Sequence, residues 1–113
     1  MLFRSSVKRI AQVIGIRPQD IEEYERIHAD VWPSVLATIK KANIQNYSIF
    51  RYEHLLFAYM EYTGTDYEAD MKSIAADPET QRWWKITDPM QSQVPESRPG
   101  EWWHVIPENF HVD

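Results

Sequence analysis

The chain has 113 residues and a formal net charge of -5, with no cysteine, five Trp, six Tyr and four Phe. This length fits one domain over residues 1–113, and the lack of cysteine excludes disulfide bonds and thiolate metal sites and fits a cytoplasmic protein. An acidic chain with no basic face and no long apolar run is expected to bind neither nucleic acid nor a membrane.

The N-terminal segment predicts a strand. Residues 8–16 are rich in β-branched side chains, and Arg17-Pro18 marks a boundary after them. Residues 1–18 contain four basic residues and no acid, a pattern that is weakly typical of a transit peptide. We interpret residues 8–16 as part of the fold and residues 1–6 as a candidate flexible arm.

A helical pattern follows, in which apolar side chains recur at spacings of three and four over residues 21–39. Pro33 lacks a backbone donor and clashes with the preceding turn, so the helix should kink or break near Trp32-Pro33. This break would lie about one helical turn from His28.

Two strands are predicted at residues 44–52 and 55–62, joined by a tight turn at Glu53-His54. Because side chains alternate along a strand, Tyr47, Ile49 and Arg51 should share one face of the first strand.

Two helices are expected next. Thr65, followed three residues later by Glu68, has the form of a capping box and predicts the start of a short helix. Asp77-Pro78 combines a capping residue with the residue favoured at the first helical position, which predicts another helix.

The C-terminal part is predicted to contain a loop, a strand and a tail. Residues 87–100 include three prolines and a glycine, so we expect a loop long enough to act as a lid. Residues 101–106 should form an aromatic strand, and residues 108–113 a tail.

The order of elements predicts an α+β protein with the ferredoxin-like, split βαβ arrangement, in which helices cover one face of an antiparallel sheet. The other sheet face would remain exposed. Small domains of this kind pair sheet to sheet, so we expect a homodimer with a dimeric α/β-barrel-type assembly.

Trp83-Trp84 is the most informative pair of residues. On a helix their side chains point about a hundred degrees apart, so one core face cannot bury both. Such a pair could line two sides of a cleft for a ligand with flat apolar surfaces, such as a sugar ring. Alternatively, one indole belongs to the core and the other to a dimer interface.

His28 is the candidate acid–base group, because an imidazole exchanges protons near neutral pH. Tyr24, one turn earlier, and Tyr47 could orient a polyol with their hydroxyl groups. The alternative for all three is a core side chain with satisfied hydrogen bonds. The chain has no H-E-x-x-H motif and no close histidine pair, so no metal site is expected.

Several segments, taken in order, resemble the L-rhamnose mutarotase family. The first matches the family motif E-Y-x-x-x-H-x-x-[IV]-W-P, the second matches N-Y-x-I, and a later one matches R-W-W. The similar segments are residues 23–33, 46–49, 55–58 and 81–85, followed by Thr87, Asp88 and Met90.

This resemblance implies a small dimeric α+β isomerase that interconverts the α and β anomers of L-rhamnose without a cofactor. It implies His28 as the proton donor and a monosaccharide site formed by Tyr24, Tyr47 and the Trp83-Trp84 pair. The resemblance covers about residues 7–90. The segments 91–98 and 101–106 look less similar and the tail looks additional, so a close 6-deoxyhexose such as L-fucose remains an alternative substrate.

Two other functions stay open on the sequence alone. A haem-degrading or quinone-forming monooxygenase is one, because small dimeric ferredoxin-like proteins host such chemistry; this is an analogy of fold only. A non-catalytic sugar-binding module is the other, and only the rate of anomer exchange separates it from a mutarotase.

Overall fold

A computed structural model describes residues 7–113, and the candidate arm at residues 1–6 lies outside the described residues. Within the described part, no helix has both the length and the apolar character needed to cross a bilayer. The elements are β1 (Lys8–Ile16), η1 (Pro18–Asp20), α1 (Ile21–His28), α2 (Pro33–Lys41), β2 (Ile44–Tyr52), β3 (Leu55–Tyr62), α3 (Tyr67–Ala76), α4 (Pro78–Thr87), η2 (Asp88–Met90), β4 (Gln91–Ser92) and β5 (His104–Ile106).

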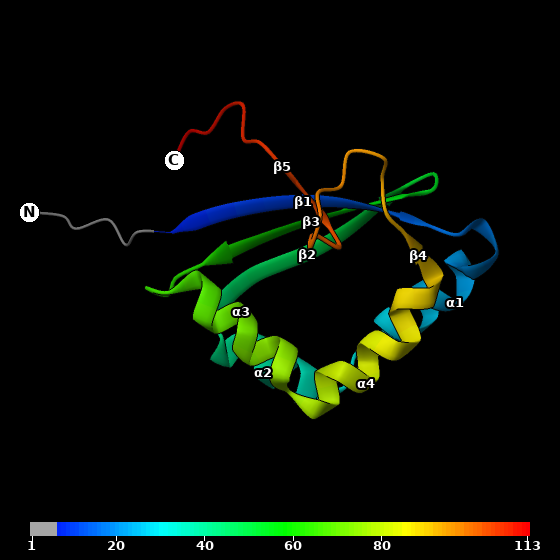
Figure 1. Ribbon diagram of the computed structural model, residues 1–113, viewed down its shortest axis with the longest axis horizontal. Helices are drawn as coiled ribbons and strands as arrows, with labels where there is room; N and C mark the ends of the chain where they lie inside the picture. Colours follow the sequence, from blue (N-terminus) through cyan, green and yellow to red (C-terminus); the bar gives the residue numbers. More distant parts are fainter. Residues whose placement is uncertain (1–6) are drawn as a thin grey trace, which may run out of the picture.

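The sheet has the strand order expected for a ferredoxin-like fold. The order is β2-β3-β1-β4, every pairing is antiparallel, and β5 also pairs with β1. Helices α1 to α4 lie on one side of this sheet, as Figure 1 shows. The predicted α+β class and the predicted helix-covered antiparallel sheet are confirmed.

Alternation along β1 and β3 produces the buried face. Ile10 lies opposite Met60 and Ile14 opposite Leu56, and all four are at least nine-tenths buried. Apolar side chains from α1, α2 and α3 pack on this face in two clusters, one toward each end of the sheet. The site described below is built around the cluster that contains Ile14 and Leu56.

The predicted break at Pro33 is confirmed. α1 ends at His28, and Pro33 is the first residue of α2, where its missing N–H has no intrahelical partner to lose. His28 therefore lies in the last turn of a short helix, at a corner of the chain.

A β-bulge interrupts β2. Gln45 pairs with Glu61 but the next pair is Ser48 with Tyr59, so Asn46 and Tyr47 face a single residue of β3. Asn46 adopts a positive φ of 49°, which an asparagine tolerates better than most residues. Tyr47 is the second residue of the bulge, and the regular pairing with β3 resumes at Ser48.

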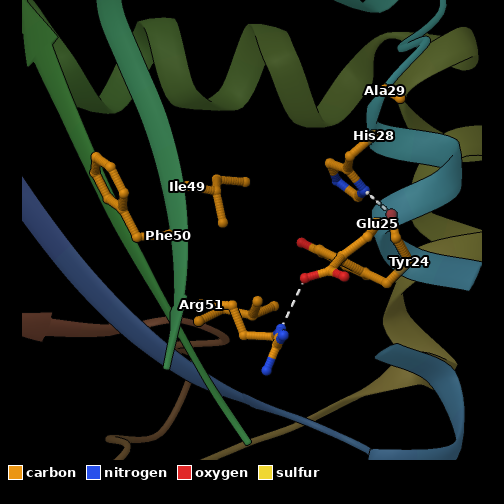
Figure 2. Close-up of a pocket in the computed structure, with 8 residues that line it drawn as sticks. Tyr24, Glu25, His28, Ala29, Ile49, Phe50 and Arg51 are labelled. Carbon is orange, nitrogen blue, oxygen red and sulfur yellow. Dashed lines mark hydrogen bonds and ion pairs between the residues drawn. The ribbon is translucent and has the colours of Figure 1, made fainter. Parts of the chain in front are cut away.

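Beyond the bulge, Ile49 and Arg51 lie opposite the buried Ala58 and Leu56. Figure 2 shows both side chains pointing toward α1, while Phe50 points to the other side of the strand. The prediction that Tyr47, Ile49 and Arg51 share one face is therefore confirmed for Ile49 and Arg51. Tyr47 lies in the bulge, outside the regular ladder, and its place on this face stays a prediction.

The predicted capping box at the start of α3 is wrong. The helix begins at Tyr67, one residue later than that motif requires, and its N-cap is Asp66, whose carboxylate accepts a hydrogen bond from the backbone N–H of Ala69 at 3.1 Å. The Asp77-Pro78 start of α4 is confirmed, because Asp77 accepts from the Thr80 N–H at 2.9 Å.

The C-terminal prediction is wrong in two places. The expected loop contains η2 and β4, because Gln91 and Ser92 pair with the free edge of β1. The expected strand over residues 101–106 is reduced to β5, because the Glu101 carboxylate accepts from the backbone N–H groups of Arg98 and Val105 and so closes a turn.

Candidate active site

Tyr24 and His28 form a stacked pair on α1. They are four residues apart on one helix face, their ring centroids are 3.9 Å apart and the ring planes differ by 24°. His28 Nδ1 also lies 2.7 Å from the backbone carbonyl oxygen of Tyr24. A carbonyl oxygen only accepts, so Nδ1 carries the hydrogen and the neutral ring has its lone pair on Nε2.

Trp83 on α4 contacts this pair. Its ring meets that of His28 edge-on with centroids 5.3 Å apart, and that of Trp32 in the same way at 5.2 Å. Trp83 is buried, whereas Trp84 is 38% exposed. Among residues 7–113, no ring contact joins Trp84 to His28 or Trp32, so the structure brings together one indole of the pair and leaves the other at the surface.

A pocket opens between α1 and the β2–β3 hairpin, as seen in Figure 2. Its volume is about 270 Å³, just below the usual range of about 300–1,000 Å³ for small-molecule sites. Its walls combine aliphatic and aromatic surface with a few polar groups. The lining residues are Tyr24, Glu25, His28, Ala29, Ile49, Phe50, Arg51 and Leu56.

An ion pair crosses this pocket. Arg51 on β2 donates through Nε to the carboxylate of Glu25 on α1 at 2.7 Å, and through a terminal nitrogen to the Glu53 carbonyl at 3.0 Å. Glu25 and His28 are three residues apart on α1, and Figure 2 shows both pointing toward β2. The ion pair therefore supplies charged hydrogen-bonding groups beside the imidazole.

Gln91 and Trp102 belong to the site although sequence reasoning missed them. The Trp102 indole N–H donates to Gln91 Oε1 at 2.7 Å, and Gln91 Nε2 lies 3.4 Å from the Tyr24 hydroxyl. Gln91 is 5% exposed and Tyr24 is 4% exposed. A glutamine that follows a proline-containing segment gives no sign in the sequence that it is buried. Its burial follows from the pairing of β4 with β1, in which Gln91 lies opposite Ile16.

Tyr47 reaches the same region from the bulge of β2. It is 40% exposed; its phenol contributes electrostatically to the raised pKa of Tyr24, and Tyr67 on α3 contributes in the same way to the raised pKa of Tyr47. The structure thus gathers Tyr24, His28 and Trp83 into direct contact, and holds Tyr47 and Trp84 farther out.

Burial sets the protonation of the stacked pair. It lowers the pKa of His28 below its ordinary value of 6.5, and the hydrogen bond to the Tyr24 carbonyl opposes that shift only in part. Burial also raises the pKa of Tyr24, against the effect of the hydrogen bond from Gln91. At neutral pH the site therefore presents a neutral imidazole and a neutral phenol.

Such an arrangement can move a proton without help from a metal. The imidazole offers an unprotonated Nε2, the aromatic rings offer flat apolar walls, and Glu25 and Arg51 offer polar contacts for hydroxyl groups. Among residues 7–113, no three histidine or acidic side chains cluster closely enough to hold a metal ion.

Known proteins resemble this chain along most of its length. The family model described as L-rhamnose mutarotase matches residues 9–112. An L-rhamnose mutarotase from Lactiplantibacillus plantarum is 32% identical over 107 residues, which cover 93% of this chain and 98% of that protein. One from Oceanobacillus iheyensis is 30% identical over 109 residues, covering 95% of this chain and all of that protein.

A solved structure has the same fold. The crystal structure of an L-rhamnose mutarotase from Formosa agariphila matches with a TM-score of 0.73 at 19% identity, covering 94% of this chain and 99% of that one. The family match through residue 112 also corrects the expectation that the similarity ends near residue 90 and that the tail is additional.

Proposed function

Because the chain belongs to the L-rhamnose mutarotase family, we propose that it interconverts the α and β anomers of L-rhamnose or of a closely related 6-deoxyhexose. This reaction makes the protein an isomerase that needs no cofactor. The 6-methyl group and the apolar side of the sugar ring suit the aromatic and aliphatic walls of the pocket between α1 and the β2–β3 hairpin.

The chemistry requires one proton to leave the anomeric hydroxyl and another to reach the ring oxygen. The ring bond at C1 then breaks, the C1–C2 bond rotates, and the ring closes on the other face of the carbonyl. His28 handles the anomeric proton in both directions: its Nε2, unprotonated at neutral pH, accepts this proton on opening and, as the proton donor that the resemblance implies, returns it on closure. The ring oxygen takes its proton on opening from water or a hydroxyl group of the site, and gives it back on closure.

The remaining aromatic residues of the site bind the sugar in this proposal. Tyr24 and Tyr47 orient its hydroxyl groups, and the Trp83-Trp84 pair packs against its apolar surface, as the family resemblance implies. Of these four residues Tyr24 lines the pocket, and Trp83 contacts the His28 ring from α4. The observation that carries the proposal is the fixed tautomer of His28, which leaves a basic nitrogen on a ring that borders the pocket.

The test is anomer exchange, measured by NMR saturation transfer between the two anomeric protons of equilibrated L-rhamnose. We expect protein-dependent transfer that His28→Ala reduces by about a hundredfold or more. His54→Ala is the matched control, because His54 is an exposed histidine of the β2–β3 turn. Full activity of a folded His28→Ala variant would refute the role of His28, and no transfer with wild-type protein on L-rhamnose or L-fucose would refute the proposed reaction.

We also propose that the chain forms a homodimer through the uncovered sheet face, in a dimeric α/β-barrel-type assembly. Phe50 and Tyr52, which alternate on that face of β2, are 61% and 69% exposed. Exposed aromatic side chains on adjacent positions of one sheet face are typical of an interface. Light scattering should give twice the chain mass for the wild type and the mass of one chain for Phe50→Asp; a wild-type monomer at micromolar concentration would rule out the dimer.

A further inference from the structure

The polar contacts behind Tyr24 have a fixed direction. The indole N–H of Trp102 is a donor with no accepting capacity, and it lies 2.7 Å from Gln91 Oε1. This short contact assigns the oxygen of the Gln91 amide to the side that faces Trp102. The amide nitrogen must then point the other way, toward the Tyr24 hydroxyl 3.4 Å away.

The direction of the Gln91 amide determines what the Tyr24 hydroxyl can do. An amide NH2 group only donates, so the hydroxyl oxygen of Tyr24 accepts from it. The hydroxyl hydrogen of Tyr24 is not used in this contact and stays available for another acceptor. Since both side chains are at least nine-tenths buried, bulk water does not replace this contact.

The two stacked rings of the site therefore have complementary roles. The Tyr24 carbonyl leaves His28 with an accepting Nε2, and Gln91 leaves Tyr24 with a donating hydroxyl. A sugar has hydroxyl groups that donate and a ring oxygen that only accepts. One acceptor and one donor on neighbouring rings match this pattern.

We propose that Gln91, oriented by Trp102, is a positioning residue that keeps the Tyr24 hydroxyl as a hydrogen-bond donor to an oxygen of the bound sugar. This inference rests on the proposed mutarotase function and adds two residues to its site. It also gives the C-terminal segment a role in the reaction, because Trp102 lies just before β5.

Gln91→Glu tests the direction of the hydrogen bond with almost no change in shape. A carboxylate can still accept from Trp102, but it also accepts from Tyr24 and so captures the hydroxyl hydrogen. We expect the exchange efficiency on L-rhamnose to fall roughly as far as in Tyr24→Phe, on the order of a hundredfold. Relative to wild type at the same pH, the variant should recover as the pH falls, because the introduced carboxyl group can donate once it is protonated.

A double-mutant cycle separates positioning from a general structural role. If Gln91 acts through the Tyr24 hydroxyl, adding Gln91→Glu to Tyr24→Phe should cause no further loss of exchange. Additive losses, or a Gln91→Glu variant that keeps wild-type exchange efficiency, would overturn the inference.

Trp102→Phe provides a second route if Gln91→Glu does not fold. It removes the indole N–H that orients the amide while it keeps Gln91 and most of the aromatic surface. We expect a loss of several-fold that disappears in the Tyr24→Phe background, and unchanged exchange would contradict the inference. Exchange by the wild type is the reference: its absence refutes the proposed function, whereas its presence with unaffected Gln91 and Trp102 variants refutes only the positioning role.

Discussion

Two buried tyrosines, Tyr24 and Tyr62, differ in how their hydroxyl groups are used. Both are 4% exposed, and they belong to the two different core clusters on the helix-covered face of the sheet. The Tyr62 hydroxyl donates to the carboxylate of Asp70 and accepts from the backbone N–H of Asp66 at 3.0 Å. The Tyr24 hydroxyl accepts from the amide of Gln91.

The chemistry of the hydrogen-bonding partner, more than burial, separates a structural tyrosine from a functional one. Burial raises the pKa of both phenols. The hydrogen bond to Asp70 raises the pKa of Tyr62 further, with a smaller opposing effect of the Asp66 N–H, whereas the hydrogen bond from Gln91 lowers the pKa of Tyr24. A carboxylate uses the hydroxyl hydrogen inside the fold, and an amide NH2 leaves it for a ligand.

Removing each hydroxyl should give opposite results, and this is the largest effect that we expect from the two tyrosines. Tyr24→Phe should reduce anomer exchange by on the order of a hundredfold, because a preorganised donor to the substrate is lost. Tyr62→Phe should leave the exchange rate per folded molecule unchanged and lower the midpoint of thermal unfolding by roughly 5 °C, since two hydrogen bonds of the fold are lost.

Saturation transfer and thermal unfolding measured on the same two variants would decide this prediction. Equal losses of exchange in Tyr24→Phe and Tyr62→Phe would mean that both tyrosines act through stability. Normal exchange in Tyr24→Phe would remove the distinction between them.

The next largest effect that we expect is the loss of anomer exchange at low pH. Protonation of His28 occupies Nε2, so the exchange efficiency should fall about tenfold per pH unit below the pKa of His28. Burial holds that pKa below 6.5, so the decline should begin on the acid side of the ordinary imidazole range. NMR titration of the imidazole, assigned with His28→Gln, gives the same pKa independently, and a decline that begins above 6.5 would contradict it.

The lowered pKa of His28 also makes the free energy of unfolding depend on pH. The unfolded chain binds a proton at His28 near pH 6.5, before the folded chain does. The free energy of unfolding should therefore fall as the pH decreases from about 6.5 to the lower pKa of the folded protein. His28→Gln should remove this part of the pH dependence, whereas His54→Ala should keep it.

Much of the fold could be predicted because its signals are local. The apolar alternation of β1 and β3, the turn between β2 and β3, and the effect of Pro33 each depend on a few neighbouring residues. Tyr24 and His28 could be placed on one helix face for the same reason. Their spacing of four residues is sufficient to predict that the two rings meet.

The rest of the site depends on contacts between distant segments. Gln91 meets Tyr24 across 67 positions of the chain, and its burial follows from pairing with the edge of β1. Trp102 was expected in a strand, but the hydrogen bonds of Glu101 turn the chain before β5. Backbone N–H groups of Arg98 and Val105, together with His104, lower the pKa of Glu101 to about 2, which shows how strongly its charged form is held in that turn. No local pattern predicts such a network.

The smallest effect that we expect concerns the N-cap of α3, which is hydrogen-bonded to the structural tyrosine, Tyr62. Asp66 both caps α3 with its side chain and donates its backbone N–H to Tyr62, so it joins the helix to the structural tyrosine. Asp66→Ala should lower the free energy of unfolding by about 1 kcal/mol, the usual effect of losing a cap, without changing anomer exchange. Thr65→Ala should change neither quantity, because the capping oxygen belongs to Asp66.

Urea unfolding of the two variants distinguishes them, and a larger loss of unfolding free energy in Thr65→Ala would restore the capping box that the sequence suggested. A loss of exchange in Asp66→Ala would show instead that the Tyr62 end of the sheet supports the site, so that the two tyrosines do not act independently.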